Sequence, residues 1–544
     1  MSDIDVNDYG GTLEYVDFGY DIPEDDFVRF VVLFIKTMLK SFNLENEIFP
    51  SAKDNKKGYA LHKIASLVYY AYAKGFTNAS VIADFAKNHK YYRFAANGIT
   101  PDEDTINNFI NKWGSFFEYM LAYTVQFSII AGFTNFENIS TDSTVLKAAN
   151  NKFNVIHKDD AKTLLAYYLG HRVSPKKLKH LRYPAARFRS RGDLSNLKKI
   201  NILKEILRKF KETGKNTIPI NDMEAIHLKD KSGKTTVGYN VQTAVDSMSK
   251  MFICILLSDK ATDHYQFPDI IEKAMDNMGE MPDTTCVDAG YNTRRVLEYI
   301  EEMGLNVLMD NNRSAKLKNG HKNENKYHKD NMDYDYEEDF FLCYNKKRLT
   351  YQGTKVKWDK KKQDYVIERN YFNKEACYNC PYAEECCSGK YRKVTMNGGI
   401  LALKMDKKMQ DYENILKYLT RFSTVEAPNG TLKIHFHINE ILSTGMSNIQ
   451  NRLNICAGAY NLIRIYNILM GKEDIGGDNI LIVAKSFCES TNVIMPIWRN
   501  NKFSFKNEVL ALPYICESII EKELMNMVES NDGTIQTSLI EACD

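Results

Sequence analysis

The sequence predicts an α/β fold, and two observations carry that prediction. Between residues 135 and 312, short apolar runs rich in β-branched residues alternate with segments of helical periodicity, a pattern typical of strands connected by helices. On either side, from about 25 to 130 and from 406 to 470, apolar residues recur at helical spacing. A chain of 544 residues is long enough for several domains.

Five segments of the α/β region are expected to form strands. They lie at 138–149, 234–246, 250–259, 284–288 and 305–310. A helix is expected over 267–279, between the third and fourth strands.

The two flanking regions are expected to be helical. In the first, Thr100 to Glu103 has the form of a capping box ahead of a helical run. The second is expected to break around the APNG segment, residues 427–430.

Composition and charge exclude several protein classes. No apolar run approaches the length of a membrane span, which argues against a membrane partner. The first 30 residues contain nine acidic residues and one basic residue, Arg29, the reverse of a secretory signal peptide. The 11 Cys residues are too sparse for a disulfide scaffold and are expected to be reduced thiols. The sequence therefore predicts an intracellular protein.

One segment, Arg172 to Lys215, is strongly basic. It contains 15 Lys and Arg residues against three acidic residues, although the whole chain has a net charge of only +2. Apolar residues from Leu197 to Phe210 recur at helical spacing, which predicts a helix with a basic outer face. This density favours a polyanion partner such as DNA, and a solvated helix surface is the alternative. The candidate phosphate contacts are Arg187, Arg189, Arg191, Lys198 and Lys199.

Three acidic residues in separate segments are candidate metal ligands. Asp142 lies in the first strand, Asp288 ends a later strand, and Glu426 lies near the start of a helical region. Each has a plain alternative role, because a single acidic residue often caps a helix or shapes a turn. Together they supply the hard oxygen ligands that Mg²⁺ prefers. Two such ions can activate a hydroxyl or water and stabilise the leaving oxygen in phosphodiester displacement.

Basic residues flank Glu426. Arg421 precedes it by five residues and Lys433 follows it by seven, and a helix would place Lys433 on the same face as Glu426. This arrangement suits a polyanionic substrate, so both are candidate DNA contacts.

The order of these segments resembles the DDE class of bacterial insertion-sequence transposases, the branch with a helical N-terminal domain. STDSTVLKA (140–148) is similar to the first catalytic block of that family, CVDAGYN (286–292) to the second and STVEAPNGTLK (423–433) to the third. GYNVQTAVD (238–246) is similar to a core block, and Pro101–Ile106 to the PDxxTI element of the N-terminal domain. The likeness spans roughly residues 25 to 470.

The resemblance implies an RNase H-like core in which Asp142, Asp288 and Glu426 are the catalytic carboxylates and bind Mg²⁺ or Mn²⁺. It matches Arg421 and Lys433 to the basic residues of the third block. The implied function is a DNA transposase that cleaves and transfers strands at the ends of an insertion sequence. The implied partners are double-stranded DNA, at the terminal inverted repeats and the target, and further copies of the chain, in the bacterial cytoplasm at the nucleoid.

Two other functions stay open from the sequence. One is a transposase-derived DNA-binding protein that has lost the chemistry, and the other is a metal-dependent nuclease of the same fold. Three carboxylates favour the active transposase. In that interpretation Ala289-Gly290 lets the backbone turn sharply after Asp288.

The expected domain organisation follows from these segments. A helical N-terminal domain, a candidate for binding DNA ends, is expected at 1–134. The first part of the core follows at 135–312 and contains a basic helical insertion at 161–224. A polar Cys-rich insertion is expected at 313–400, a helical part of the core with Glu426 at 401–475, and a tail at 476–544.

A cysteine cluster predicts a structural zinc site. ACYNCPYAEECCSG, residues 376–389, contains four thiols close together, and Cys343 lies upstream. Zinc in structural sites takes four ligands in tetrahedral geometry. The resemblance implies Cys343, Cys377, Cys380 and Cys386 as ligands and leaves Cys387 spare. A set of unpaired thiols is the alternative.

Overall fold

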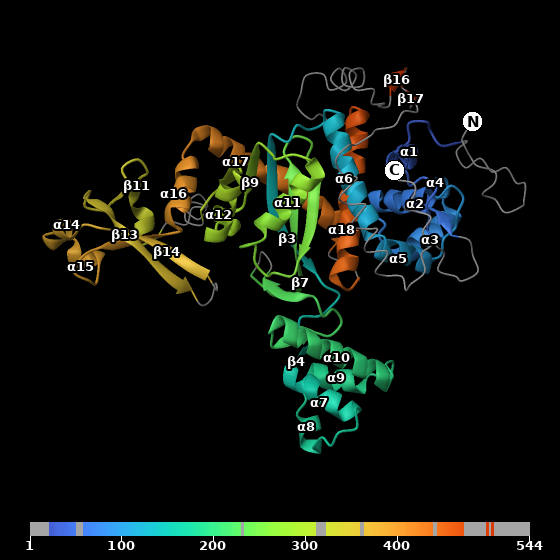
Figure 1. Ribbon diagram of the computed structural model, residues 1–544, viewed down its shortest axis with the longest axis horizontal. Coiled ribbons are helices and arrows are strands. Elements are labelled where there is room, and N and C mark those ends of the chain that lie inside the picture. Colours follow the sequence, from blue (N-terminus) through green and yellow to red (C-terminus); the bar gives the residue numbers. More distant parts are fainter. Residues whose placement is uncertain are drawn as a thin grey trace, which may run out of the picture.

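The computed structural model describes residues 21–49, 58–229, 233–311, 323–359, 364–438 and 443–472, and two short strands, β16 (Ile497–Arg499) and β17 (Lys502–Ser504). Figure 1 shows a central body that contains a sheet, and a helical lobe that extends from one end of this sheet. A β-rich region lies beside the central body. Apart from β16 and β17, the tail expected at 476–544 lies outside the described residues.

The central body is built on a six-stranded mixed sheet. The strand order is β10-β9-β3-β7-β6, and β8 also pairs with β7. β3 is parallel to β9 and antiparallel to β7, and β10 is parallel to β9. The strands are β3 (Asn138–Lys147), β6 (Ile226–Lys229), β7 (Thr235–Asp246), β8 (Phe252–Ser258), β9 (Thr284–Val287) and β10 (Val307–Met309). All five expected strands are confirmed, and β6 was not expected.

Different helices cover the two faces of this sheet. Ile139 of β3 packs in one hydrophobic cluster with residues of α11 (Phe267–Met278) and α12 (Arg294–Met303). Leu146 of β3 packs in another cluster with residues of α17 (Tyr412–Ile434) and α18 (Met446–Leu469). Since side chains alternate along a strand, even-numbered residues of β3 face α17 and odd-numbered residues face α11.

The N-terminal helices share their core with α18. Asn461 of α18 is fully buried; its amide bonds the backbone N–H and C=O of Phe252 in β8 at 2.9 and 2.8 Å. It also donates to Thr124 Oγ1 at 2.9 Å, which ties α18 to the N-terminal helices. These helices, with a small hairpin of β1 (Ile48–Phe49) and β2 (Tyr59–Ala60), are α1 (Phe27–Ser41), α2 (Leu61–Ala73), α3 (Ala79–Asn88), α4 (Lys90–Ala95), α5 (Glu103–Lys112) and α6 (Gly114–Ile130).

Two local expectations were wrong. The cap of α5 is Asp102 and not Thr100: the Asp102 carboxylate accepts the Thr105 N–H at 2.9 Å, and Asp is a better N-cap than Thr. The break expected at 427–430 does not occur, since α17 runs through Pro428. Pro428 and Asn429 are buried, and this packing outweighs the low helix propensity of proline.

The helical lobe, residues 155–219, has a hydrophobic core of its own. Leu203, Ile206 and Phe210 of its longest helix are buried in that core, as their spacing predicts, whereas Leu197 is exposed. The elements are β4 (Val155–His157), α7 (Lys158–Tyr168), α8 (Pro175–Lys179), α9 (Tyr183–Ser190), α10 (Asn196–Thr213) and β5 (Thr217–Pro219).

The β-rich region, residues 333–397, is a five-stranded antiparallel sheet with two short helices, where the sequence predicted only a polar insertion. Asp364 docks the region on the central body, because its carboxylate accepts from Arg294 Nη2 at 2.6 Å and from Tyr265 Oη at 3.2 Å. The elements are β11 (Asp333–Asp335), β12 (Phe340–Leu342), β13 (Arg348–Asp359), β14 (Asp364–Phe372), α14 (Lys374–Tyr378), α15 (Ala383–Cys386) and β15 (Lys393–Asn397), and α16 (Gly399–Lys408) follows.

Among the described residues, no helix combines the length and the apolar composition that crossing a membrane requires.

Candidate active site

Asp142 and Asp288 lie side by side on neighbouring strands. Thr141 of β3 pairs with Val287 of β9 in parallel register, so the next residue along each chain is Asp142 or Asp288. Adjacent strands of a sheet are about 4.8 Å apart. The sheet therefore brings these two carboxylates together, as the sequence analysis required.

The guanidinium of Arg421 bridges the two carboxylates. Nη2 donates to Asp288 Oδ2 at 2.9 Å, and Nη1 lies 3.5 Å from Asp142 Oδ1. Burial disfavours the charge of Arg421, but Asp288, Tyr418 and Asp142 outweigh burial and hold its pKa above the ordinary value. Arg421 is only 5% exposed, so its charge is directed at the carboxylates and not at the surface, where a DNA contact was expected.

The turn after Asp288 uses the other oxygen of that carboxylate. Oδ1 accepts the Gly290 N–H at 2.8 Å and caps the short 3₁₀ helix η2 (Ala289–Tyr291), so Asp288 has the capping role as well. Gly290 does not adopt a positive φ, contrary to the reason expected for it. A Cβ atom there would lie 3.3 Å from Asp288 Oδ1 and 3.7 Å from Asp263 Oδ2. Glycine therefore leaves room between two carboxylates.

Glu426 lies on α17, the helix that carries Arg421, but its side chain is exposed. Across the part of the chain that the structure describes, no three His, Cys, Asp or Glu side chains are close enough to hold a metal ion. The structure thus joins Asp142 to Asp288 and does not join Glu426 to them. Lys433, half-buried, lies on α17 two turns beyond Glu426, on the same helix as expected.

Asn429 is a site residue that the sequence analysis missed. Its Nδ2 lies 3.5 Å from Asp142 Oδ2, and its Oδ1 accepts from Thr243 Oγ1 at 3.3 Å. Asn429 follows Glu426 by three residues, so this contact brings the Glu426 segment of α17 next to β3. The three-residue spacing between Glu426 and Asn429 was the feature of the sequence that could have identified Asn429 as a site residue.

The family profile described as "Transposase DDE domain" matches residues 342–466. The chain carries a DDE transposase domain. The matched residues contain Arg421, Glu426 and Lys433, whereas Asp142 and Asp288 precede them. No curated protein matches the chain. The resemblance to DDE-class transposases is confirmed, and the bacterial branch stays a prediction.

Five thiols of the transposase domain surround one small cavity of about 30 Å³. Cys343 Sγ accepts the Lys347 N–H at 3.4 Å, and Cys380 Sγ accepts from Asn345 Nδ2 at 3.6 Å. Burial raises the pKa of the Cys377 thiol, and the neighbouring thiols of Cys387, Cys343 and Cys380 raise it further. The fifth thiol, Cys387, lies 3.4 Å from the Gly389 carbonyl oxygen. The thiols lining the cavity are those of Cys343, Cys377, Cys380, Cys386 and Cys387.

The basic residues of the helical lobe differ in their availability to DNA. Arg187 and Lys198 are exposed, and Arg189 is half-buried. Arg191 Nε donates to Asp193 Oδ1 at 3.0 Å, so its charge is already paired. Lys199 is 5% exposed and donates to the Arg189 carbonyl oxygen at 3.0 Å, which places it inside the lobe and not on a DNA-binding surface.

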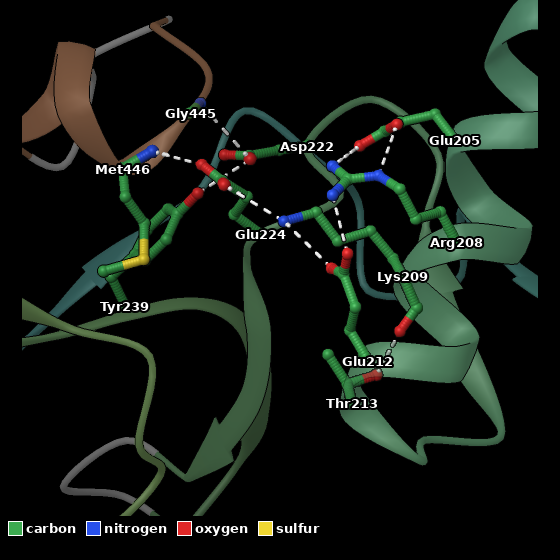
Figure 2. A network of polar contacts seen from close by, with 10 residues as sticks. All are labelled: Glu205, Arg208, Lys209, Glu212, Thr213, Asp222, Glu224, Tyr239, Gly445 and Met446. Carbon is green, nitrogen blue, oxygen red and sulfur yellow. Dashed lines mark hydrogen bonds and ion pairs between the residues drawn. The ribbon is translucent and has the colours of Figure 1, made fainter.

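A polar network anchors the lobe to the central body (Figure 2). Lys209 of α10 lies 3.3 Å from Glu224 Oε1, and Glu224 Oε2 accepts the Met446 N–H at 2.7 Å at the start of α18. Asp222 accepts from Tyr239 Oη of β7 at 2.7 Å. Carboxylates at a helix N-terminus are favourable, so Glu224 holds both the start of α18 and the lobe.

Proposed function

We propose that the chain is a DNA transposase in which Asp142, Asp288 and Glu426 hold divalent cations and direct strand cleavage and transfer. The in-register pair of carboxylates carries this proposal, because the two side chains point at one positive group, the Arg421 guanidinium. Two carboxylates that accommodate the guanidinium cation between them are also suitable ligands for a divalent metal cation.

The donor set fits Mg²⁺ or Mn²⁺, which take carboxylate oxygens and retain water. When bound, such ions polarise the phosphate and favour ionisation of the attacking water or hydroxyl. Asp142 and Asp288 each contribute one carboxylate, and the central sheet holds the two residues side by side. Glu426 precedes Asn429, which contacts Asp142, by less than one helical turn of α17, and its exposed side chain would have to turn toward the pair to share a cation.

The arrangement of the sheet supports an RNase H-like core. Three strands, β3, β7 and β8, form an antiparallel unit, and β9 and β10 extend it in parallel to β3. We propose that the helical lobe and the β-rich region are insertions in that core, and that the chain belongs to the bacterial insertion-sequence branch.

DNA that flanks the coding region provides the test substrate, carried on a plasmid and incubated with the full chain and Mg²⁺. A transposase cuts at the ends of the flanking DNA and joins those ends to a second DNA. A same-fold nuclease cuts without joining, and a DNA-binding derivative binds without cutting. Either of the last two results would overturn the proposal.

We further propose that the lobe binds the DNA backbone through its exposed cations. Replacing Arg187 and Lys198 with Ala should weaken binding equally for flanking and random DNA, because phosphate contacts do not read bases. Each lost contact should reduce the log–log slope of affinity against salt by roughly 0.9. Fluorescence anisotropy at several salt concentrations measures both effects.

Arg208 offers a matched control on the same lobe. Its guanidinium is paired with Glu205 and, at 2.6 Å, with Glu212, so Arg208→Ala removes a cation that is already neutralised. We expect a smaller change in slope from this variant. A double variant that keeps the wild-type slope would mean that the DNA path lies elsewhere.

A structural zinc ion is proposed for the cysteine cavity, with Cys343, Cys377, Cys380 and Cys386 as ligands. Among the described residues no three such side chains lie close enough to hold a metal ion, so zinc binding would have to draw these thiols together. Elemental analysis of protein purified without chelator should find about one Zn per chain. Cys377→Ser with Cys380→Ser should remove that zinc, whereas Cys387→Ser should retain it, since Cys387 already contacts Gly389. Zinc-free wild-type protein with unchanged melting would contradict this proposal.

A further inference from the structure

Asp263, between β8 and α11, accepts hydrogen bonds on both oxygens of its carboxylate. Oδ2 accepts from Ser143 Oγ at 2.9 Å. Oδ1 accepts from Asn240 Nδ2 at 2.7 Å and from Gln242 Nε2 at 2.9 Å. Three side chains on two strands of the sheet therefore converge on one carboxylate that no sequence motif singled out.

The first connection leads to Asp142. Ser143 is the next residue along β3 and faces α11, while Asp142 faces α17. Ser143 pairs with Gln242 across the β3–β7 ladder, so the bonds from Asp263 fasten both strands at the level of Asp142. A shift or rotation of β3 at Asp142 would have to break the bond between Ser143 and Asp263.

The second connection leads to the turn after Asp288. Gln242 Oε1 accepts a hydrogen bond from the Tyr291 hydroxyl. Burial raises the pKa of Tyr291 well above its ordinary value, so this hydroxyl remains a donor and fixes the Gln242 amide with Nε2 toward Asp263. In addition, His264 Nδ1 lies 2.9 Å from the Gly290 carbonyl oxygen.

We propose that Asp263 is a positioning residue that holds Asp142 and Asp288 in the arrangement that binds the divalent cation. The inference rests on the proposed function, since it assigns a role toward the same metal site. Asp263 acts through Ser143 on one carboxylate and through Gln242 and Tyr291 on the other. Residues that orient metal ligands in this way typically change metal affinity about 10- to 100-fold when replaced.

The test is calorimetric titration of the full chain with Mn²⁺ alone. Asp263→Ala should bind Mn²⁺ at least about 10-fold more weakly than the wild type. Asp263→Asn should recover most of the affinity, because its Oδ1 still accepts from Asn240 and Gln242 and its amide group donates to Ser143. Ser143→Ala, a milder change, should give a smaller loss and serves if Asp263→Ala does not fold.

Asp246 on the same strand as Gln242 provides the matched control. It is a buried carboxylate that accepts from the Ser249 N–H and hydroxyl, both at 2.6 Å, away from the candidate site. Asp246→Ala should lower the melting temperature and leave Mn²⁺ affinity unchanged.

The outcomes separate the two proposals. If the wild type binds Mn²⁺, Asp142→Asn abolishes that binding, and Asp263→Ala or Ser143→Ala binds as the wild type does, the positioning role is overturned and the metal site stands. If the wild type itself does not bind Mn²⁺, the proposed metal site fails and the role of Asp263 fails with it.

Discussion

Asp142→Asn and Asp288→Asn should each reduce Mg²⁺-dependent DNA cleavage by about three orders of magnitude or more. A metal ion contributes several kcal/mol of charge stabilisation in the transition state, and about 1.4 kcal/mol corresponds to a factor of ten in rate. Each substitution removes a charged oxygen ligand but keeps the shape of the side chain. Single-turnover cleavage of the flanking DNA measures the rate, and anisotropy should show that DNA binding is retained.

Asp283→Asn is the matched control for this experiment. Asp283 is exposed and precedes β9, so it lies at the end of that strand opposite to Asp288. Cleavage by this variant should match the wild type. Full activity in Asp142→Asn or Asp288→Asn would remove these residues from the chemistry.

Arg421→Met should destabilise the protein most when no divalent cation is present. The substitution leaves Asp142 and Asp288 facing each other without the cation that bridges them. Breaking a fully buried ion pair costs about 3–5 kcal/mol. The side chain of Asp288 is 44% exposed and that of Asp142 is 21% exposed, so solvent reduces the expected loss to roughly 2 kcal/mol.

Metal ions should reverse much of this loss. Because Mg²⁺ or Mn²⁺ can neutralise the same two carboxylates, either ion should raise the melting temperature of Arg421→Met more than that of the wild type. Thermal unfolding with and without Mn²⁺ measures the difference.

Arg369→Met provides the comparison for Arg421→Met. Arg369 is 8% exposed and bonds Asp339 and, at 2.9 Å, the Tyr371 hydroxyl in the β-rich region. Its loss should destabilise the protein with no dependence on Mn²⁺. Equal responses of the two variants to Mn²⁺ would argue against a shared site for Arg421 and the metal.

The strands of the central sheet were predictable because local sequence patterns determine them. Apolar runs at 250–259 and 284–288 are long enough for strands and too short for helices, and each is followed by turn residues. Asp288 directly follows such a run, so its place at a strand end followed from the sequence. The resemblance of the blocks around Asp142 and Asp288 then paired two residues that are far apart in the chain.

The direction in which helical side chains point was less predictable. Arg421 and Glu426 are five residues apart, and which of them faces the sheet depends on how α17 packs. Lys198 and Lys199 show the same limit: one is exposed and the other is buried against Tyr168, although their local sequence is nearly identical.

Two further features carried no local signal. β13 is exposed along most of its length, so it lacks the alternation of apolar and polar residues that identifies a half-buried strand. Asp263 lies between a strand and a helix, and only the folded structure brings Ser143, Asn240 and Gln242 to it.

Cleavage of the polypeptide by Fe²⁺ tests most directly whether Asp142, Asp288 and Glu426 share bound metal. Fe²⁺ in place of Mg²⁺ generates hydroxyl radicals at the metal site when ascorbate and peroxide are added, and mass spectrometry locates the cuts. We predict cuts near residues 142, 288 and 426 that excess Mg²⁺ suppresses and Asp142→Asn abolishes. Cuts near 142 and 288 without any near 426, or cuts confined to other segments, would contradict a shared metal site.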